Sequence, residues 1–141
     1  AVAAGLLPEP LTTLATDIQG GTAVADDNGI DFIPVALTVN QAALDARASD
    51  ICAFLKAYEM AVQAIAADPE AYRDNPLRIP DAVRASYTIP QFAAPRVPTE
   101  AEIQNVVEWM IEGELVEQAP AYDDLVDGRF VAAMQAVTLD E

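Results

Sequence analysis

The side chains of this chain that could do chemistry are mostly carboxylates. The 141 residues include 23 Asp and Glu but no His, and Cys52 is the single cysteine. Without histidine, a Ser-His-Asp triad, a Cys-His pair or a histidine-based metal site cannot form. One cysteine allows no internal disulfide, and its neighbours Ile51 and Phe54 favour an inert core thiol. We therefore expect no metal and no cofactor.

Paired carboxylates could still serve acid–base catalysis. The nearest pairs are Glu112 with Glu114 and Asp123 with Asp124. Residues this close on a helix point away from each other, so neither pair converges on one reacting atom. The segment 26–31 resembles a calcium loop, but valines would occupy its first and twelfth ligand positions. The sequence predicts a turn there, and it predicts that the protein is not an enzyme.

Charge restricts the possible partners. The formal net charge of −16 repels phosphate backbones and anionic lipid surfaces, so we expect no nucleic-acid partner. Between Val97 and Gly128 the chain has nine acidic residues and no Lys or Arg. This run is either a solvated helical face or a docking surface for a basic partner.

Helical periodicity and capping signals predict most of the secondary structure. The expected helices cover 11–18, 51–67, 69–74, 100–112 and 123–137, the last with a break near Gly128, and residues 81–86 are expected to add one or two turns. Gly20-Gly21 is expected to end the first helix, Ser49 to cap the long helix, and Asp68 with Pro69 to start the helix after it. Thr99 with Glu102 forms a capping box. The predicted buried stripe of the long helix consists of Ile51, Phe54, Leu55, Tyr58, Val62 and Ile65.

Strand signals are few. Residues 22–25 form a weak candidate, and Pro34–Asn40 is the best, because it is apolar and β-branched almost throughout. A strand of that kind needs neighbours, since one or two strands alone are marginal. Five or so helices with so few strands predict the end of a doubly wound α/β lobe whose first strands are missing.

Several segments, taken in order, carry a family resemblance. They are LLPEPL at 6–11, FLKAYEMAV at 54–62, DPEAY at 68–72, IP at 89–90, PTEAEI at 98–103, WM at 109–110, and Leu115 with YDDLVD at 122–127. This series resembles the C-terminal part of ABC-transporter solute-binding proteins of the nitrate/sulfonate/taurine/bicarbonate type, whose relatives bind thiamine-pyrimidine precursors. The chain departs from that family in two respects: members are about twice as long, and Gly113-Glu114-Leu115 interrupts the usual Gly-Leu-Leu.

The resemblance implies a fold and a function. The expected fold class is α/β: the helix-rich C-terminal portion of a type II periplasmic-binding-protein fold, with few strands and an incomplete lobe. Residues 1–141 would form a single domain of a two-lobe, extracytoplasmic protein that captures a small solute and delivers it to ABC permease subunits. In that family the Glu-Pro turn lies near the cleft rim, so Glu9, Pro10 and Thr12 are the candidate ligand-binding residues. Glu9 would accept hydrogen bonds from an amine or a pyrimidine amino group, with Thr12 as a neighbouring donor.

Two alternatives accompany this interpretation. The chain could be an acidic interaction domain with no small-molecule ligand, and Glu9 could simply cap its own helix. Because an interior strand at Pro34–Asn40 would have an open edge, we also expect the isolated chain to self-associate.

Overall fold

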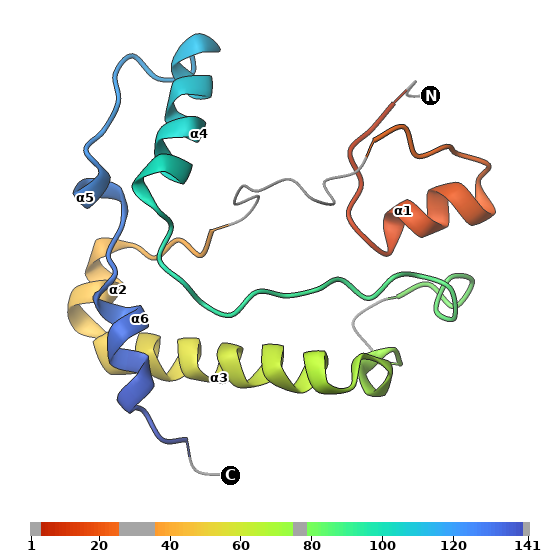
Figure 1. Ribbon diagram of the computed structural model, residues 1–141, viewed down its shortest axis with the longest axis horizontal. Coiled ribbons are helices and arrows are strands. Elements are labelled where there is room, and N and C mark those ends of the chain that lie inside the picture. Colours follow the sequence, from red (N-terminus) through yellow and green to blue (C-terminus); the bar gives the residue numbers. More distant parts are fainter. Residues whose placement is uncertain (1–3, 26–35, 75–78, 140–141) are drawn as a thin grey trace. The chain divides into compact units, whose positions relative to one another are not determined.

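The computed structural model describes residues 4–25, 36–74 and 79–139 (Figure 1). In chain order the helical elements are α1 (Leu11–Thr13), η1 (Leu14–Ile18), α2 (Gln41–Ala46), α3 (Ala48–Ala67), η2 (Pro69–Tyr72), α4 (Glu100–Glu112), α5 (Tyr122–Leu125), α6 (Arg129–Ala133) and η3 (Met134–Ala136). None of the described helices combines the length and the apolar character that a membrane crossing requires.

The predicted α/β fold class is wrong for the residues that the structure describes, because none of them forms a β-strand. Residues 22–25 and 36–40 have no ladder partner, and Asn40 instead caps α2 by accepting a hydrogen bond from the Ala43 N–H at 2.8 Å. A strand exists only through its inter-strand hydrogen bonds, so an apolar, β-branched segment without a neighbour stays irregular. The rest of the predicted strand and the 26–31 turn lie outside the described residues.

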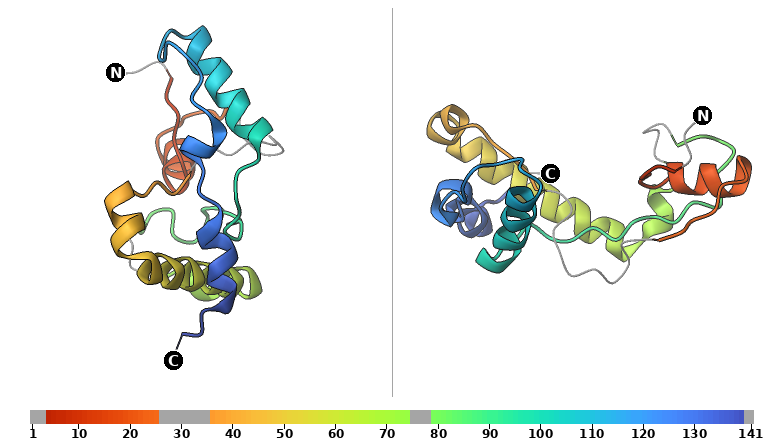
Figure 2. Two further views of the ribbon diagram at one scale, coloured as in Figure 1. Left: turned by 90° about the vertical axis from the view of Figure 1, so that its left-hand side faces the viewer. Right: turned by 90° about the horizontal axis from the view of Figure 1, so that it is seen from above.

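The chain divides into two compact units, one formed by residues 1–29 and 61–93 and the other by residues 30–60 and 94–141. The second unit holds a cluster of buried apolar side chains, Cys52, Leu55, Phe130 and Met134. Figures 1 and 2 show why: α6 lies beside the first half of α3. Cys52 is a buried, free thiol, as the sequence predicted.

The first unit buries Thr13, Val62, Val83 and Tyr87. Arg73, just after η2, joins two of its segments. Its guanidinium donates to the Arg84 carbonyl at 3.2 Å and to the Tyr87 carbonyl at 2.9 Å, and it lies 5.2 Å from the centre of the Tyr87 ring. Residues 81–86 form hydrogen-bonded turns, as predicted.

Several local predictions are confirmed. Asp68 caps η2 with Pro69 in its first turn, Thr99 and Glu102 form the capping box of α4, and the last predicted helix breaks near Gly128. The buried stripe of α3 is only partly as predicted. Leu55 and Val62 are buried, whereas Phe54 is 53% exposed and Tyr58 is 41% exposed.

Candidate functional site

The predicted ligand-binding residues lie on a tight turn at the start of α1. The Pro8 carbonyl accepts from the backbone N–H groups of Leu11 and Thr12 at 2.9 and 3.2 Å, which closes the first helical turn. The Glu9–Pro10 peptide bond is cis, and both residues are half-buried. The turn therefore holds Glu9 at the beginning of the helical segment, where exposed N–H groups favour a negative charge.

Glu9 is fixed by the residue one helical turn later. Its Oε2 atom accepts from the Thr13 hydroxyl at 2.8 Å and from the Thr13 backbone N–H at 3.4 Å. Thr13 is the buried polar residue of this unit. Within the described residues no hydrogen bond reaches Oε1 of Glu9. The carboxylate thus has one oxygen held by the fold and one available as an acceptor.

Thr12 also forms a hydrogen bond, in which its hydroxyl is the donor. Its hydroxyl donates to the Leu7 carbonyl at 2.6 Å. A threonine hydroxyl has one proton and two acceptor lone pairs, so the oxygen remains an acceptor towards any further group. The sequence indicated a donor at this position, whereas the geometry leaves an acceptor. The ligand-binding role of Glu9, Pro10 and Thr12 stays a prediction.

Two glycines end the helical segment that carries this turn. Gly20 has a φ of +73°, a left-handed conformation that side chains disfavour. Gly21 approaches the backbone closely: its N–H donates to the Ala15 carbonyl at 2.8 Å, and a Cβ there would lie 2.9 Å from the same oxygen. The predicted helix stop at Gly20-Gly21 is therefore confirmed, for a steric reason.

The structure also brings together a feature that the sequence did not identify as a site. In the second unit, a hollow of about 540 Å³ lies between α4 and residues 119–123. Its lining residues are Glu100, Ile103, Gln104, Val107, Glu108, Ile111, Ala119, Pro120, Ala121, Tyr122 and Asp123. We call this hollow the α4 groove. The groove forms because the chain reverses after α4, so the hydrophobic periodicity of the sequence could not predict it.

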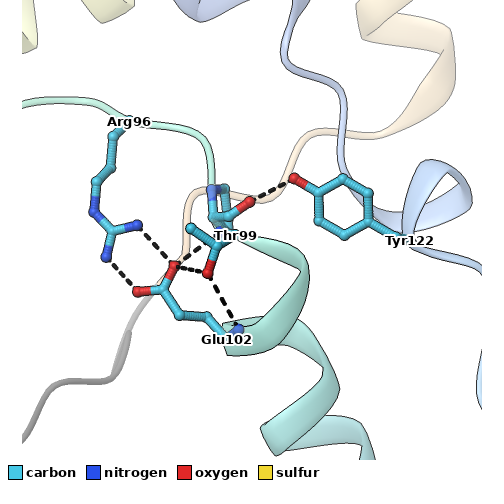
Figure 3. A network of polar contacts seen from close by, with 5 residues as sticks. Arg96, Thr99, Glu102 and Tyr122 are labelled. Atoms are coloured by element: carbon cyan, nitrogen blue, oxygen red, sulfur yellow. Dashed lines mark hydrogen bonds and ion pairs between the residues drawn. The ribbon is translucent and has the colours of Figure 1, made fainter.

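The N-terminal end of the α4 groove is held by polar contacts (Figure 3). Glu102 accepts from the Thr99 N–H at 2.8 Å and from Arg96 at 2.8 Å, and the Tyr122 hydroxyl donates to the Pro98 carbonyl. The Arg96 guanidinium, followed by the Thr99 N–H, lowers the pKa of Glu102 from its ordinary 4.5 to about 2. These contacts join α5 to the segment that starts α4.

The C-terminal end of α4 reverses the chain. The Glu114 N–H donates to the Ile111 carbonyl at 3.0 Å, and the Leu115 N–H donates to the Met110 carbonyl at 2.8 Å. This is the Schellman pattern of helix termination, which requires a left-handed residue. That residue is Glu114, with a φ of +56°, whereas Gly113 has a φ of −82°. The returning segment then runs back beside α4 (Figures 1 and 2).

Acidic residues are numerous in this chain. Among the described residues, no group of three or more His, Cys, Asp or Glu side chains is arranged to hold a metal ion. A second hollow of about 490 Å³ lies between α3 and α6, beside Cys52, Phe130 and Arg129. Neither hollow includes Glu9.

Comparison with protein-family models, with curated proteins and with solved structures finds no match to this chain. The family resemblance therefore rests on the order and spacing of its own segments.

Proposed function

We propose that this chain takes part in solute capture for an ABC importer, within an extracytoplasmic substrate-binding component for a nitrate-, sulfonate-, taurine- or pyrimidine-precursor-like solute. The described residues form no sheet, so the proposal does not rest on fold. It is supported by the ordered series of family-like segments, two of which coincide with complete local structures. These are the Asp68 cap with η2 and the Thr99 capping box with α4.

The observation that carries the proposal is the state of the Glu9 carboxylate. One oxygen is anchored by Thr13, which fixes the direction of the group, and the other has no hydrogen-bond partner among the described residues. A fixed acceptor loses little side-chain entropy when a ligand binds, so pre-organisation of this kind favours recognition. Helix capping by Glu9 and ligand contact by Glu9 are therefore compatible.

The chemistry of the turn selects among the solutes. Glu9 Oε1 and the Thr12 oxygen are both acceptors, so they suit a ligand with N–H donors, such as an ammonium or an exocyclic amino group. Nitrate has no donor, and its negative charge is repelled by a chain of net charge −16. Within the proposed solute range, an aminopyrimidine or taurine fits this turn better than nitrate.

Solution NMR of the 141-residue chain would test the proposal. We expect 4-aminopyrimidine and taurine to shift the amide signals of residues 8–14, whereas nitrate at the same ionic strength does not. One carboxylate wall provides few contacts, so binding should be weak, with a dissociation constant of about 1 mM, or roughly −4 kcal/mol.

The variant Glu9→Gln should remove these shifts, because an amide oxygen preserves the bond from Thr13 but lacks the charge. Asp17→Asn is the matched control, since Asp17 lies on η1 in the same unit and is exposed. Shifts that persist in Glu9→Gln, or that appear only outside residues 8–14, would refute the assignment. Micromolar binding would contradict the expectation that one wall of a cleft binds weakly.

The proposed partners are the solute and the ABC permease subunits. Self-association was expected from an open strand edge at Pro34–Asn40, and that edge is not formed by residues 36–40. Any association of copies would instead involve exposed apolar side chains such as Leu37, which is 60% exposed. Sedimentation at low and physiological salt distinguishes a monomer from an association that strengthens as salt screens the charge.

A further inference from the structure

The α4 groove has an apolar floor along one face of its helix. Ile103, Val107 and Ile111 recur every four residues, so they form one row. Val107 is buried, Ile103 is half-buried and Ile111 is 38% exposed. The floor is thus covered at Val107 in its middle, and it is open to another molecule at Ile111 and, in part, at Ile103.

The rim of the groove is acidic on both sides. Glu100, Gln104 and Glu108 form a second row on α4, and Asp123 stands on the opposite wall. The row spans about 12 Å, since each residue rises about 1.5 Å along a helix. All four side chains belong to exposed residues. A ligand in the groove would meet an apolar centre between two carboxylate edges.

The basic residues that the structure describes pair with carboxylates outside this rim. Six of the seven basic residues lie among the described residues, and each is paired with a carboxylate of its own neighbourhood. In the acidic run 97–128, Glu102 and Asp127 have such partners. No ion pair among the described residues involves Glu100, Glu108 or Asp123. Within the described part of the chain, these three carboxylates are therefore open to a cation from another molecule.

The groove walls are held in place before any partner arrives. The capping box and the Tyr122–Pro98 hydrogen bond fix one end, and the Schellman reversal after α4 fixes the other. A preformed groove lowers the cost of ordering on binding. Its length, its straight apolar row and its charged edges match the mode in which an amphipathic helix docks into a groove.

We propose that the α4 groove binds a basic amphipathic helix of another protein, two to three turns long. Apolar residues at helical spacing would cover the exposed parts of Ile103 and Ile111 on either side of buried Val107, and flanking Lys or Arg side chains would pair with Glu108 and Asp123. A second copy of this chain is a poor occupant, because its net charge of −16 repels. Anionic lipid is disfavoured for the same reason. This inference is independent of solute capture by the Glu9 turn.

The test uses a fluorescein-labelled peptide of Leu and Lys, about 11 residues or three helical turns long, with Leu at helical spacing. Fluorescence anisotropy would report its binding to the 141-residue chain. Two further probes are a scrambled peptide of the same composition and a helical peptide with Glu in place of Lys. We expect binding of the first peptide, at least tenfold weaker binding of the scrambled one and no binding of the acidic one.

Matched charge variants locate the site. The double variant Glu108→Lys/Asp123→Lys changes the groove, and Glu117→Lys/Asp124→Lys makes the same change in net charge at exposed residues outside it. We expect the first to weaken binding at least tenfold and the second by less than threefold. If both double variants weakened peptide binding equally, the net charge of the chain alone would attract the peptide, and the proposal would be wrong.

The uncharged variant Ile111→Ser tests the apolar floor. We expect it to weaken binding severalfold without changing the far-ultraviolet circular dichroism of the free chain, since Ile111 is partly exposed. Unchanged affinity in this variant, or a scrambled peptide that binds as tightly as the amphipathic one, would overturn helix docking in the groove.

Discussion

Helices α3 and α4 have similar apolar stripes, but they bury them to different degrees. On α3, Cys52 and Leu55 are buried against Phe130 and Met134. On α4, Val107 is buried, whereas Val106 is 42% exposed and Trp109 is 65% exposed. The difference lies in what packs beside each helix. The first half of α3 packs against α6 and the η3 turn that continues it, whereas α4 has only the four-residue α5 and an irregular returning segment.

The comparison shows that an apolar stripe on a helix can either stabilise the fold or stay exposed as a binding surface. An apolar stripe at helical spacing gains free energy wherever another apolar surface covers it, at about 25 cal/mol per Å² removed from water. Where the partner element is short, part of the stripe stays exposed and becomes available for binding. The stability of the second unit should therefore depend on α3 far more than on α4.

The largest expected effect follows directly. Leu55→Ala should destabilise the chain by about 2–5 kcal/mol, because it leaves a cavity beside Phe130 and Met134. Ile111→Ala on α4 should cost about 1 kcal/mol or less, since that side chain is 38% exposed. Urea unfolding midpoints measure both, and equal costs would remove the distinction between the two helices.

The neighbouring residue Phe54 is the internal control for α3. Because it is 53% exposed, Phe54→Ala should cost clearly less than Leu55→Ala, about 1 kcal/mol. A loss as large as that of Leu55→Ala would mean that the predicted stripe, and not the observed burial, is correct.

The next effect concerns the start of α4. Thr99→Ala removes the side chain that accepts from the Glu102 N–H at 3.3 Å, and it should destabilise the helix by about 1 kcal/mol. Thr99→Ser retains the hydroxyl and should restore most of the loss. Circular dichroism at 222 nm with increasing urea would show both, and a Ser variant as unstable as the Ala variant would exclude capping as the cause.

A smaller effect, of opposite sign, is expected at the end of α4. Glu114 is in the left-handed conformation with a φ of +56°, which glycine adopts without steric cost. Glu114→Gly should therefore stabilise the helix end by about 0.5–1 kcal/mol. Glu112→Gly, within the same helix, should destabilise it by a similar amount. A loss of stability in Glu114→Gly would show that the Schellman reversal is not formed.

The smallest expected effect is a pH dependence. The pKa of Glu102 lies at about 2 in the folded chain, below its ordinary 4.5, chiefly because Arg96 donates to the carboxylate. A carboxyl group with a lowered folded pKa stabilises the fold fully above pH 4.5, and its contribution is lost as the pH falls towards 2. The difference in urea midpoint between the unmodified chain and Glu102→Gln should shrink over that window. A constant difference would rule out the charged capping box as its source.

By itself, the sequence determined the local helical structure. The Asp68 cap, the Thr99–Glu102 capping box and the break near Gly128 are formed by residues within a few positions of one another, so composition and spacing were sufficient to predict them. Of the candidate site, the sequence identified Glu9 and its turn. It did not predict that Thr13 anchors one carboxylate oxygen or that Thr12 donates to Leu7, because both depend on the local backbone path.

Tertiary structure decided the strand pairing, the burial of apolar side chains and the α4 groove, because each depends on another segment of the chain. Pro34–Asn40 has the composition of a strand, yet residues 36–40 find no ladder and lead into the Asn40 cap of α2. Phe54 and Leu55 are adjacent apolar residues on one helix, and only the position of α6 makes the second a core residue. The α4 groove likewise exists because the chain reverses after Glu112. Hydrogen bonds within a turn depend on neighbouring residues, whereas burial and strand pairing depend on segments far apart in the sequence.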